Sequence, residues 1–127
     1  MQKDFDKWND AKKKLNSNIF NGYVRTKEVW WCSLGLNIGF EQDGKHELFE
    51  RPVLVVRKFS RDVALIVPLS SKVKINKYCV NFLHNNQEFS ALISQIRLIS
   101  TKRLNRKIYE MDGCLFNEIR DKLRDLI

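Results

Sequence analysis

The sequence predicts a small, strongly bent sheet or partly open barrel, mainly β within the α+β class, with a helix at each end. Three observations predict this fold class: five or six short apolar segments lie close together in the chain, polar turns separate them, and helical patterns occur only at the ends. With 127 residues, of which 43% are hydrophobic, the chain is expected to be one domain spanning residues 1–127.

The first element is expected to be a helix over residues 2–16. Its apolar side chains recur at spacings of three and four: Phe5, Trp8, Ala11 and Leu15. Asp4 can cap the start, and the lysines at 12–14 favour the C-terminal end of the helix dipole. Polar residues 16–22 then form a connecting loop.

Two strands are predicted on either side of a polar, glycine-containing loop. Residues 29–34 and 52–58 are rich in β-branched and aromatic side chains, which favour strands. The loop between them carries Glu41 and Gln42, and Arg51 stands directly before the second strand. We expect the chemistry of the protein in this loop and at this arginine.

Three more strands are predicted after a turn at residues 59–62. Val63–Leu69 contains Pro68, which predicts an edge or a bulge near the strand end. Tyr78–Leu83 follows, then a polar turn at 84–87. Residues 90–99 are ambiguous between helix and strand; as a strand, they place Gln95 and Arg97 on a mixed, ligand-facing surface.

The last elements are a short helical turn, a short strand and a helix. Ser100 can cap a turn through Leu104, and residues 107–111 are expected to form a strand. The C-terminal helix has Asp112 as its cap. Its apolar face comprises Leu115, Phe116, Ile119, Leu123 and Leu126.

Composition narrows the classes of function. The formal charge of +8 and the pI of 9.6 suit an anionic partner, although solubilising surface charge explains them equally well. Three cysteines without a CxxC pair, and two distant histidines, argue against a disulfide framework or a structural zinc site. No apolar run reaches membrane-span length and no signal peptide is evident, so a cytoplasmic protein is expected.

A series of ordered blocks resembles the MazF/PemK family of toxins from bacterial toxin–antitoxin pairs. The blocks are Val29-Trp30-Trp31, Leu34-Gly35, Asn37-Ile38-Gly39, Glu41-Gln42-Asp43-Gly44, Arg51-Pro52-Val53-Leu54-Val55, Val67-Pro68-Leu69-Ser70-Ser71-Lys72, Ser90-Ala91-Leu92, Ser94-Gln95-Ile96-Arg97-Leu98-Ile99, Lys102-Arg103-Leu104 and Lys107-Ile108. Their order and spacing carry the resemblance, over roughly residues 24–127. Residues 1–22 lie outside this core, 23–127, as an added helical extension.

The resemblance implies a compact, antiparallel SH3-like barrel with a C-terminal helix. It implies sequence-specific cleavage of single-stranded RNA without a metal or other cofactor. It also implies a homodimer whose RNA groove is wrapped by a cognate acidic antitoxin. The charge of +8 agrees with these expectations.

The resemblance also assigns residues. The catalytic arginine falls on Arg51, and the hydroxyl residue, usually threonine in the family, falls on Ser70. RNA-binding positions of the family fall on Glu41, Gln42, Gln95 and Arg97. We expect Lys45, Ser71 and Lys72 to bind RNA as well. The sequence departs from the family at Phe40 and in a longer segment from Gly44 to Arg51, so base specificity does not carry over.

Cleaving RNA without a metal requires activating the 2′-OH, stabilising the phosphorane and protonating the leaving 5′-oxygen. A permanently charged, planar guanidinium at Arg51 suits charge stabilisation, and Ser70 can donate a further hydrogen bond to the same phosphate. Glu41 and His46 are the candidate bases. Products should carry 2′,3′-cyclic phosphate and 5′-OH ends.

Two alternative functions stay open. One is a non-catalytic, basic RNA-binding module. The other is a protein of the same fold that poisons another protein such as gyrase, although the family members that do so end in a tryptophan-containing tail that is missing here, because the chain ends Arg124-Asp125-Leu126-Ile127.

Overall fold

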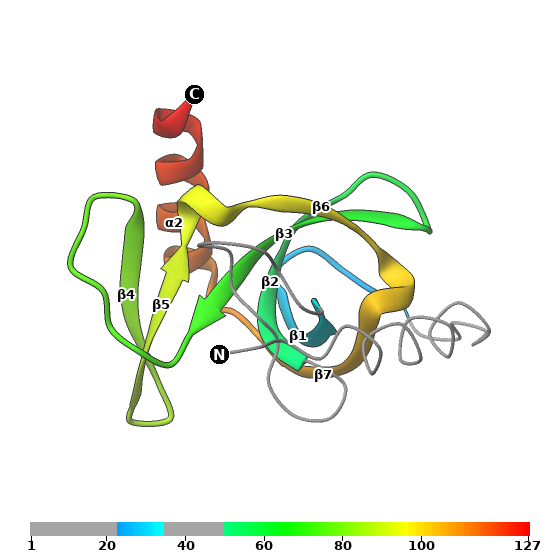
Figure 1. Cartoon of the computed structure of the whole chain (residues 1–127), viewed down its shortest axis with the longest axis horizontal. Coiled ribbons are helices and arrows are strands. Elements are labelled where there is room, and N and C mark those ends of the chain that lie inside the picture. The colour runs from blue at the N-terminus through cyan, green and yellow to red at the C-terminus, as the bar shows by residue number, and fades with distance from the viewer. Residues whose placement is uncertain (1–22, 35–49) are drawn as a thin grey trace, which may run out of the picture.

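The computed structural model describes residues 23–34 and 50–127, which form a mainly antiparallel β structure with one C-terminal helix (Figure 1). The strands are β1 (Glu28–Ser33), β2 (Glu50–Lys58), β3 (Val63–Ser70), β4 (Cys79–His84), β5 (Gln87–Leu92), β6 (Arg97–Ser100) and β7 (Leu104–Glu110). The 3-10 turns η1 (Ile93–Gln95) and η2 (Thr101–Arg103) flank β6, and helix α2 (Gly113–Leu126) ends the chain. None of the described helices has the length and apolar character needed to span a membrane. The helix expected over 2–16 lies outside the described residues.

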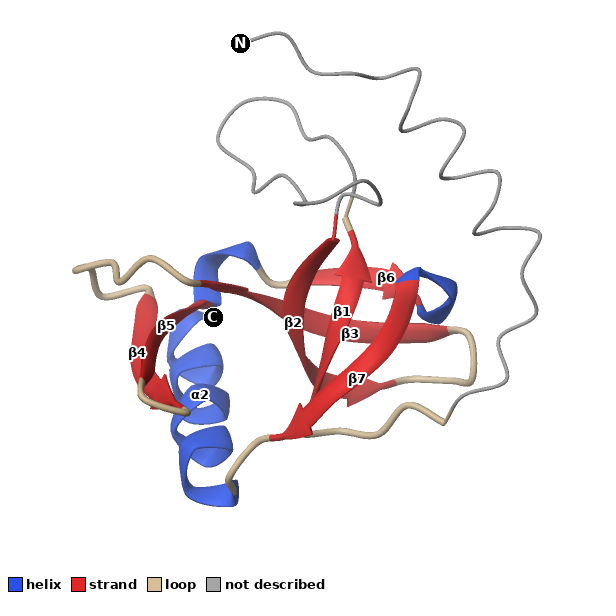
Figure 2. Ribbon diagram, turned by 90° about the horizontal axis from the view of Figure 1, so that it is seen from below, coloured by secondary structure: helices blue, strands red, loops and turns tan. Residues whose placement is uncertain are grey.

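The seven strands form one strongly curled sheet in the order β4-β5-β3-β2-β1-β7, with β6 paired to β3. All the pairings are antiparallel. Strand β3 organises the sheet, since it pairs with β2 on one side and with β6 and then β5 on the other. The curl lets β6 and β7 close over the inner face of β1, β2 and β3 (Figure 2).

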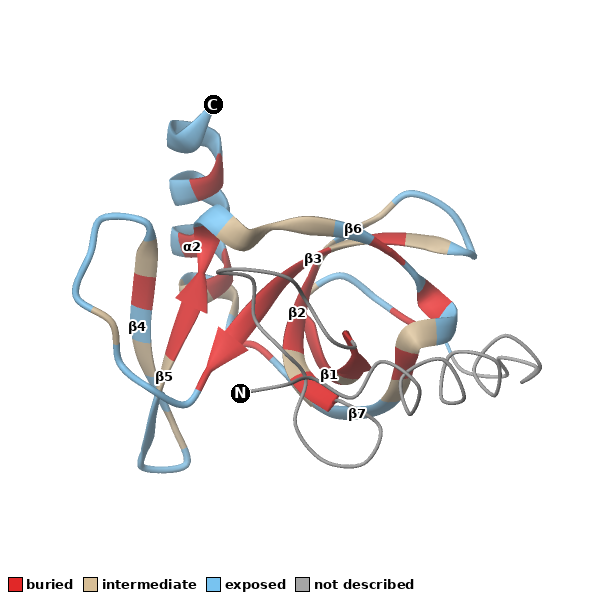
Figure 3. Ribbon diagram, in the orientation of Figure 1, coloured by how far each residue is buried: buried red, intermediate tan, exposed pale blue. Residues whose placement is uncertain are grey.

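Two apolar clusters fill the two faces of this sheet. The inner cluster lies within the curl and comprises Val24, Trp30, Cys32, Leu34, Val53, Val55, Ala64, Ile66, Ile99 and Leu104. The outer cluster joins the sheet to α2 and includes Val29, Leu54, Val67, Leu69, Phe116 and Ile119. Alternating strand residues enter the two clusters, which is why β2 and β3 are buried over most of their length (Figure 3).

Pro68 lies inside a central strand, which corrects the expectation of an edge position. On the β6 side of β3 the pairing ends at Ile66, and pairing with β5 begins only at Leu69. Pro68 therefore stands in the gap between two partners, where no ladder needs the N–H that proline lacks. On the other side Pro68 lies opposite Val53, the last pair between β2 and β3.

The strand expected over residues 90–99 is wrong as a single element. The chain forms β5 up to Leu92, turns through η1, and resumes as β6 at Arg97. The turn has a physical purpose: β5 is paired with β4 and β3, whereas β6 pairs only with the first half of β3. The 3-10 turn moves the chain from one position to the other.

The expected caps at Ser100 and Asp112 and the expected turn between β4 and β5 are confirmed. Asp112 accepts hydrogen bonds from the Cys114 and Leu115 amides at 3.0 and 3.3 Å, and α2 buries Phe116, Ile119 and Leu123. The Ser100 hydroxyl accepts a bond from the Lys102 amide at 3.3 Å, which starts η2. The hairpin turn between β4 and β5 is confirmed at Asn85 and Asn86, whose positive φ angles suit a two-residue turn.

Candidate functional site

Arg51 and Ser70 stand at neighbouring positions on β2 and β3. The register of the two strands ends at the pair Val53↔Pro68. Counting two residues further on each strand leads to Arg51 on β2 and Ser70 on β3. Since side chains alternate along a strand, Arg51 shares a face with Val53, and Ser70 shares the same face with Pro68. The fold therefore brings together two residues that are far apart in the sequence.

Both side chains are largely buried, with 9% of Arg51 and 4% of Ser70 exposed. The Ser70 hydroxyl oxygen accepts a hydrogen bond from the Lys72 amide at 3.1 Å, so its proton can be directed elsewhere. Ser70 also pairs with Ser90 of β5, whose buried hydroxyl lacks a hydrogen-bond partner within the described part of the chain. The two serines place hydroxyl groups side by side where β3 passes from β2 to β5.

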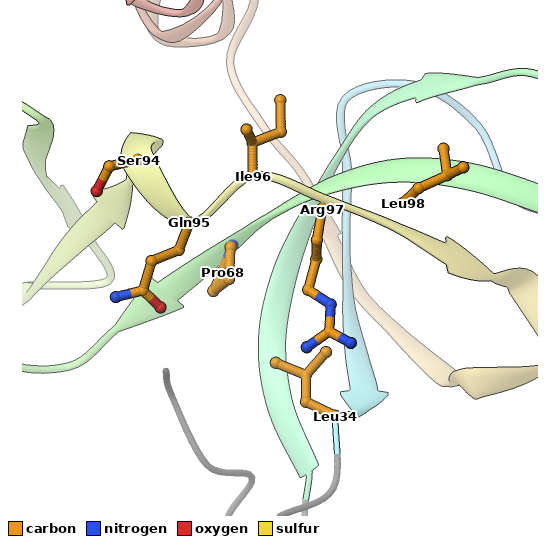
Figure 4. A pocket seen from close by; sticks show the side chains of 7 residues that line it. All are labelled: Leu34, Pro68, Ser94, Gln95, Ile96, Arg97 and Leu98. Atoms are coloured by element: carbon orange, nitrogen blue, oxygen red, sulfur yellow. The ribbon is translucent and has the colours of Figure 1, made fainter. Parts of the chain in front are cut away.

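A cavity of about 500 Å³ opens beside these positions (Figure 4). Its walls come from the end of β1, the end of β3 and the segment between η1 and β6: Leu34, Pro68, Ser94, Gln95, Ile96, Arg97 and Leu98. Gln95 and Arg97 extend on either side of Pro68, and the Arg97 guanidinium reaches toward Leu34. The sequence expectation that Gln95 and Arg97 share one surface is confirmed, although a turn and a strand position them rather than a single strand.

Positive charge gathers at this end of the curl. Arg97 lies opposite Ile66, so it belongs to the inner face, and its charge reaches the buried thiol of Cys32. Burial raises the pKa of Cys32 to about 12, although the charges of Arg103 and Arg97 act in the opposite direction. Burial, together with the charge of Arg97, lowers the pKa of Arg103. Closely placed guanidinium groups of this kind suit phosphate groups as ligands.

A polar network fixes the start of β2 to β7 on the opposite face of the sheet. Glu50, which is 5% exposed, accepts hydrogen bonds from Asn105 and Arg106, each at 3.3 Å. Asn105 also donates to the Ser33 hydroxyl at 2.9 Å. Glu50 pairs with Ser33 across β1 and β2. The residue that precedes Arg51 is thus held by two neighbouring strands.

A second, smaller cavity of about 240 Å³ has a mainly apolar wall. Arg51 and Ser71 line it together with Trp31, Leu69, Phe89 and Ile108. His84 and Tyr109 close one side; their rings stack with centroids 3.6 Å apart. Arg51 consequently borders this cavity as well as standing next to Ser70.

The other predicted site residues divide into two groups. Ser71 and Lys72 follow β3 and are exposed. Glu41, Gln42, Lys45 and His46, including both candidate bases, lie outside the described residues. Within 23–34 and 50–127, three or more metal-binding side chains do not gather at any one place.

Sequence reasoning missed two contributors. Arg103 adds charge near Cys32, and Glu50 anchors the start of β2. Arg103 was within a motif block, but its proximity to Arg97 depends on how η2 folds back. No local signal in the sequence marks Glu50, since its partners come from β1 and β7.

Within the described residues, the curled sheet, the C-terminal helix and the cavity lined by Gln95 and Arg97 define a small mainly-β protein. The family model of PemK-like, MazF-like toxins of type II toxin–antitoxin systems matches residues 25–127. The chain belongs to this family. No match is found among curated protein sequences.

Solved structures show the same fold at low sequence identity. MazF from Deinococcus radiodurans has a TM-score of 0.69 and 21% identity, covering 83% of this chain and 97% of that one. MazF in a MazE–MazF structure from the same organism has a TM-score of 0.64 and 18% identity, covering 83% and 96%. An endoribonuclease bound to its cognate antitoxin, from a mycobacterial species, has a TM-score of 0.59 and 15% identity, covering 81% and 93%.

Proposed function

We propose that the chain is an endoribonuclease toxin that cleaves single-stranded RNA at specific sequences, without a metal, and that a cognate antitoxin neutralises it. The observation that carries this proposal is the adjacency of Arg51 and Ser70 at the ends of β2 and β3. Family membership and the endoribonuclease among the similar structures support it. We also propose that the fold is the SH3-like barrel that the resemblance implies. In this proposal the chain is a single domain over 1–127 with an added N-terminal extension.

Arg51 stabilises the charge that develops on the phosphorane. Its guanidinium remains charged at any working pH and can donate two parallel hydrogen bonds to phosphoryl oxygens. Because the group is largely buried, little water competes for it, which strengthens its effect on a transition state. Ser70 donates one further hydrogen bond to the same phosphate.

Gln95 and Arg97 hold the RNA on either side of Pro68. Both line the 500 Å³ cavity, and one offers an amide while the other offers a cation. An amide can bond base edges and the cation can bond a phosphate, so the two can share a nucleotide. Glu41, Gln42, Lys45, Ser71 and Lys72 complete the RNA-binding set in this proposal.

Glu41 or His46 serves as the base that activates the 2′-OH. The base takes the proton of the 2′-OH, this oxygen attacks the adjacent phosphorus, and the bond to the 5′-oxygen breaks. The departing 5′-oxygen takes a proton from water, which leaves a 2′,3′-cyclic phosphate and a 5′-OH. DNA lacks the attacking group. The proposal therefore requires that RNA is cut and DNA of the same sequence is not.

The partners follow from charge and family. A net charge of +8 favours an acidic antitoxin as well as RNA. MazE–MazF and endoribonuclease–antitoxin complexes are known among the similar structures. We further propose a cytoplasmic homodimer whose RNA groove spans both subunits.

The test is incubation of the purified chain with a long mixed-sequence RNA and, in parallel, with single-stranded DNA of the same sequence. Discrete RNA fragments beside intact DNA would support the proposal. Binding of both nucleic acids without any cleavage would leave a non-catalytic RNA-binding module in its place.

A further inference from the structure

Two exposed aromatic rings and three cations gather at the end of the sheet remote from Arg51. Tyr23 precedes β1, while Arg57, Lys58 and Phe59 lead from β2 into the turn before β3. Figures 1 and 2 both show the segment before β1 running beside this turn. With Arg25 these residues form what we call the Tyr23–Phe59 patch.

The rings of the patch are unusually open to solvent for aromatic side chains. Tyr23 is 77% exposed and Phe59 is 56% exposed. Neither ring belongs to the two apolar clusters that stabilise the sheet. Burial in this subunit therefore does not account for either ring, and both can present a face to a ligand.

Each ring makes a cation–π contact with at least one basic side chain. Lys58 Nζ lies 4.7 Å from the centroid of the Tyr23 ring, and Arg25 Cζ lies 5.8 Å from the same centroid. Arg57 Cζ lies 5.5 Å from the centroid of Phe59. Cation–π contacts at exposed sites are weak, so these cations can transfer to a stronger anionic partner.

Within the described ranges, no salt bridge joins a cation of the patch to a carboxylate. The salt bridges there use Glu28, Glu50 and Asp121, and their cations lie outside the patch. Asp62 is the one carboxylate among residues 57–62, a segment that contains three basic residues. The patch thus presents a net positive charge.

A β-bulge gives the patch its geometry. The pairing of β2 with β3 shifts by one residue between Val55 and Arg57. Such a bulge increases the local twist and redirects the side chains that follow it. Arg57 and Lys58 stay paired with β3 in the shifted register, and their cations lie over the rings of Phe59 and Tyr23.

We propose that the Tyr23–Phe59 patch is a second binding surface for single-stranded RNA, in which bases stack on the rings and phosphates bond the cations. Alternating aromatic and basic groups are what a single strand requires, since every base has a π-face and every phosphate a charge. Lys58 lies seven residues after Arg51 along β2, a span of at most about 23 Å. The patch therefore takes RNA that flanks the cleaved segment. The inference rests on the proposed function only in naming RNA as the nucleic acid.

The experiment measures binding of a 2′-O-methyl oligouridine of about 16 nucleotides, a length that can cover an extended single-strand site. This RNA carries no attacking hydroxyl, so binding is read without cleavage and the two proposals can fail separately. Three double variants of the full chain are compared with wild type: Tyr23→Ser/Phe59→Ser, Arg57→Ser/Lys58→Ser, and the control Arg120→Ser/Lys122→Ser on α2. The control removes the same charge from exposed positions on the other side of the molecule.

We expect the ring variant to bind about tenfold more weakly, with an unchanged thermal transition, because both rings are exposed. The cation variant should lower the slope of log K against log salt by about 1.4, for two lost phosphate contacts. The control should keep the wild-type slope. Wild-type affinity in the ring variant, or equal slopes in the cation variant and the control, would overturn the proposal. The proposal would also be overturned if the ring variant lost binding to poly-glutamate but still bound RNA. That result would assign the patch to an acidic protein.

Discussion

The carboxylate of Glu50 lies 3.3 Å from the guanidinium of Arg106, joining the start of β2 to β7. Asn105 donates to the same oxygen. The carboxylate is almost fully buried, whereas the Arg106 side chain is 60% exposed. The partly exposed Arg106 side chain thus helps to hold in place Glu50, the residue that precedes Arg51. Its value is positional, since a half-exposed ion pair by itself adds little stability.

Replacing Glu50 by alanine should lower the free energy of unfolding by about 1–3 kcal/mol, because Asn105 and Arg106 lose the buried carboxylate that accepts from both. Glu50→Gln keeps an acceptor and should recover most of that loss. Urea unfolding of both variants measures the difference. Equal stability of Glu50→Ala and wild type would show that the network does not hold the strand.

The lowered pKa of Glu28 predicts how the stability of the fold depends on pH. Burial acts to raise its pKa, but hydrogen bonds from Lys107, Arg25 and Trp30, together with the Lys107 charge, bring the pKa below the ordinary value of 4.5. A depressed pKa in the folded state means that the carboxylate stabilises the fold above pH 4.5 and that this contribution is lost as pH falls through the folded pKa.

We therefore expect Glu28→Gln to be less stable than wild type at neutral pH, with the gap narrowing below pH 4.5. Thermal unfolding across pH 3–7 measures the gap, and Glu118→Gln on α2 serves as an exposed control. A gap that stays constant, or that widens on acidification, would contradict the assignment.

Ser70 offers a test of the hydroxyl. Ser70→Ala should reduce the rate of RNA cleavage by about 10²-fold, since it removes one donor to a charged transition state. Ser70→Thr keeps the hydroxyl and the residue usual in the family, and should retain most activity. Single-turnover cleavage separates these outcomes from changes in RNA affinity. Full activity in Ser70→Ala would remove Ser70 from the site.

Thiol chemistry reports on the inner cluster. Cys32 is fully buried and burial raises its pKa to about 12, whereas Cys114 is exposed. Because the thiolate is the reactive form, Cys114 should react with a disulfide reagent at pH 8 while Cys32 reacts only after unfolding. Mass spectrometry of the labelled peptides gives the order. Rapid labelling of Cys32 in the native protein would mean that the curl of the sheet opens readily.

Local signals in the sequence predicted the elements that local physics decides. The three-and-four spacing of Phe116, Ile119 and Leu123, with Asp112 before them, was sufficient for α2. The prediction of a single strand over residues 90–99 was wrong because the alternating pattern continues through η1. What breaks that strand is the change of partner from β5 to β6 along β3, which is decided by tertiary structure.

The site was predictable in part for the same reason. Motif blocks named Arg51, Ser70, Gln95 and Arg97 separately, and strand register is what makes Arg51 and Ser70 neighbours. The contribution of Arg103 depends on long-range folding that no short pattern in the sequence encodes. The candidate bases Glu41 and His46 remain predictions from the sequence.

The most direct test of the central claim is the chemistry of the cut ends. Wild type and Arg51→Ala are incubated with a long RNA in EDTA, and the new ends are mapped. We predict discrete cuts with 5′-OH and 2′,3′-cyclic phosphate ends, slowed by at least about 10³-fold in Arg51→Ala. Cuts that require a divalent metal, that leave 5′-phosphate ends, or that persist at the wild-type rate in Arg51→Ala would contradict the account.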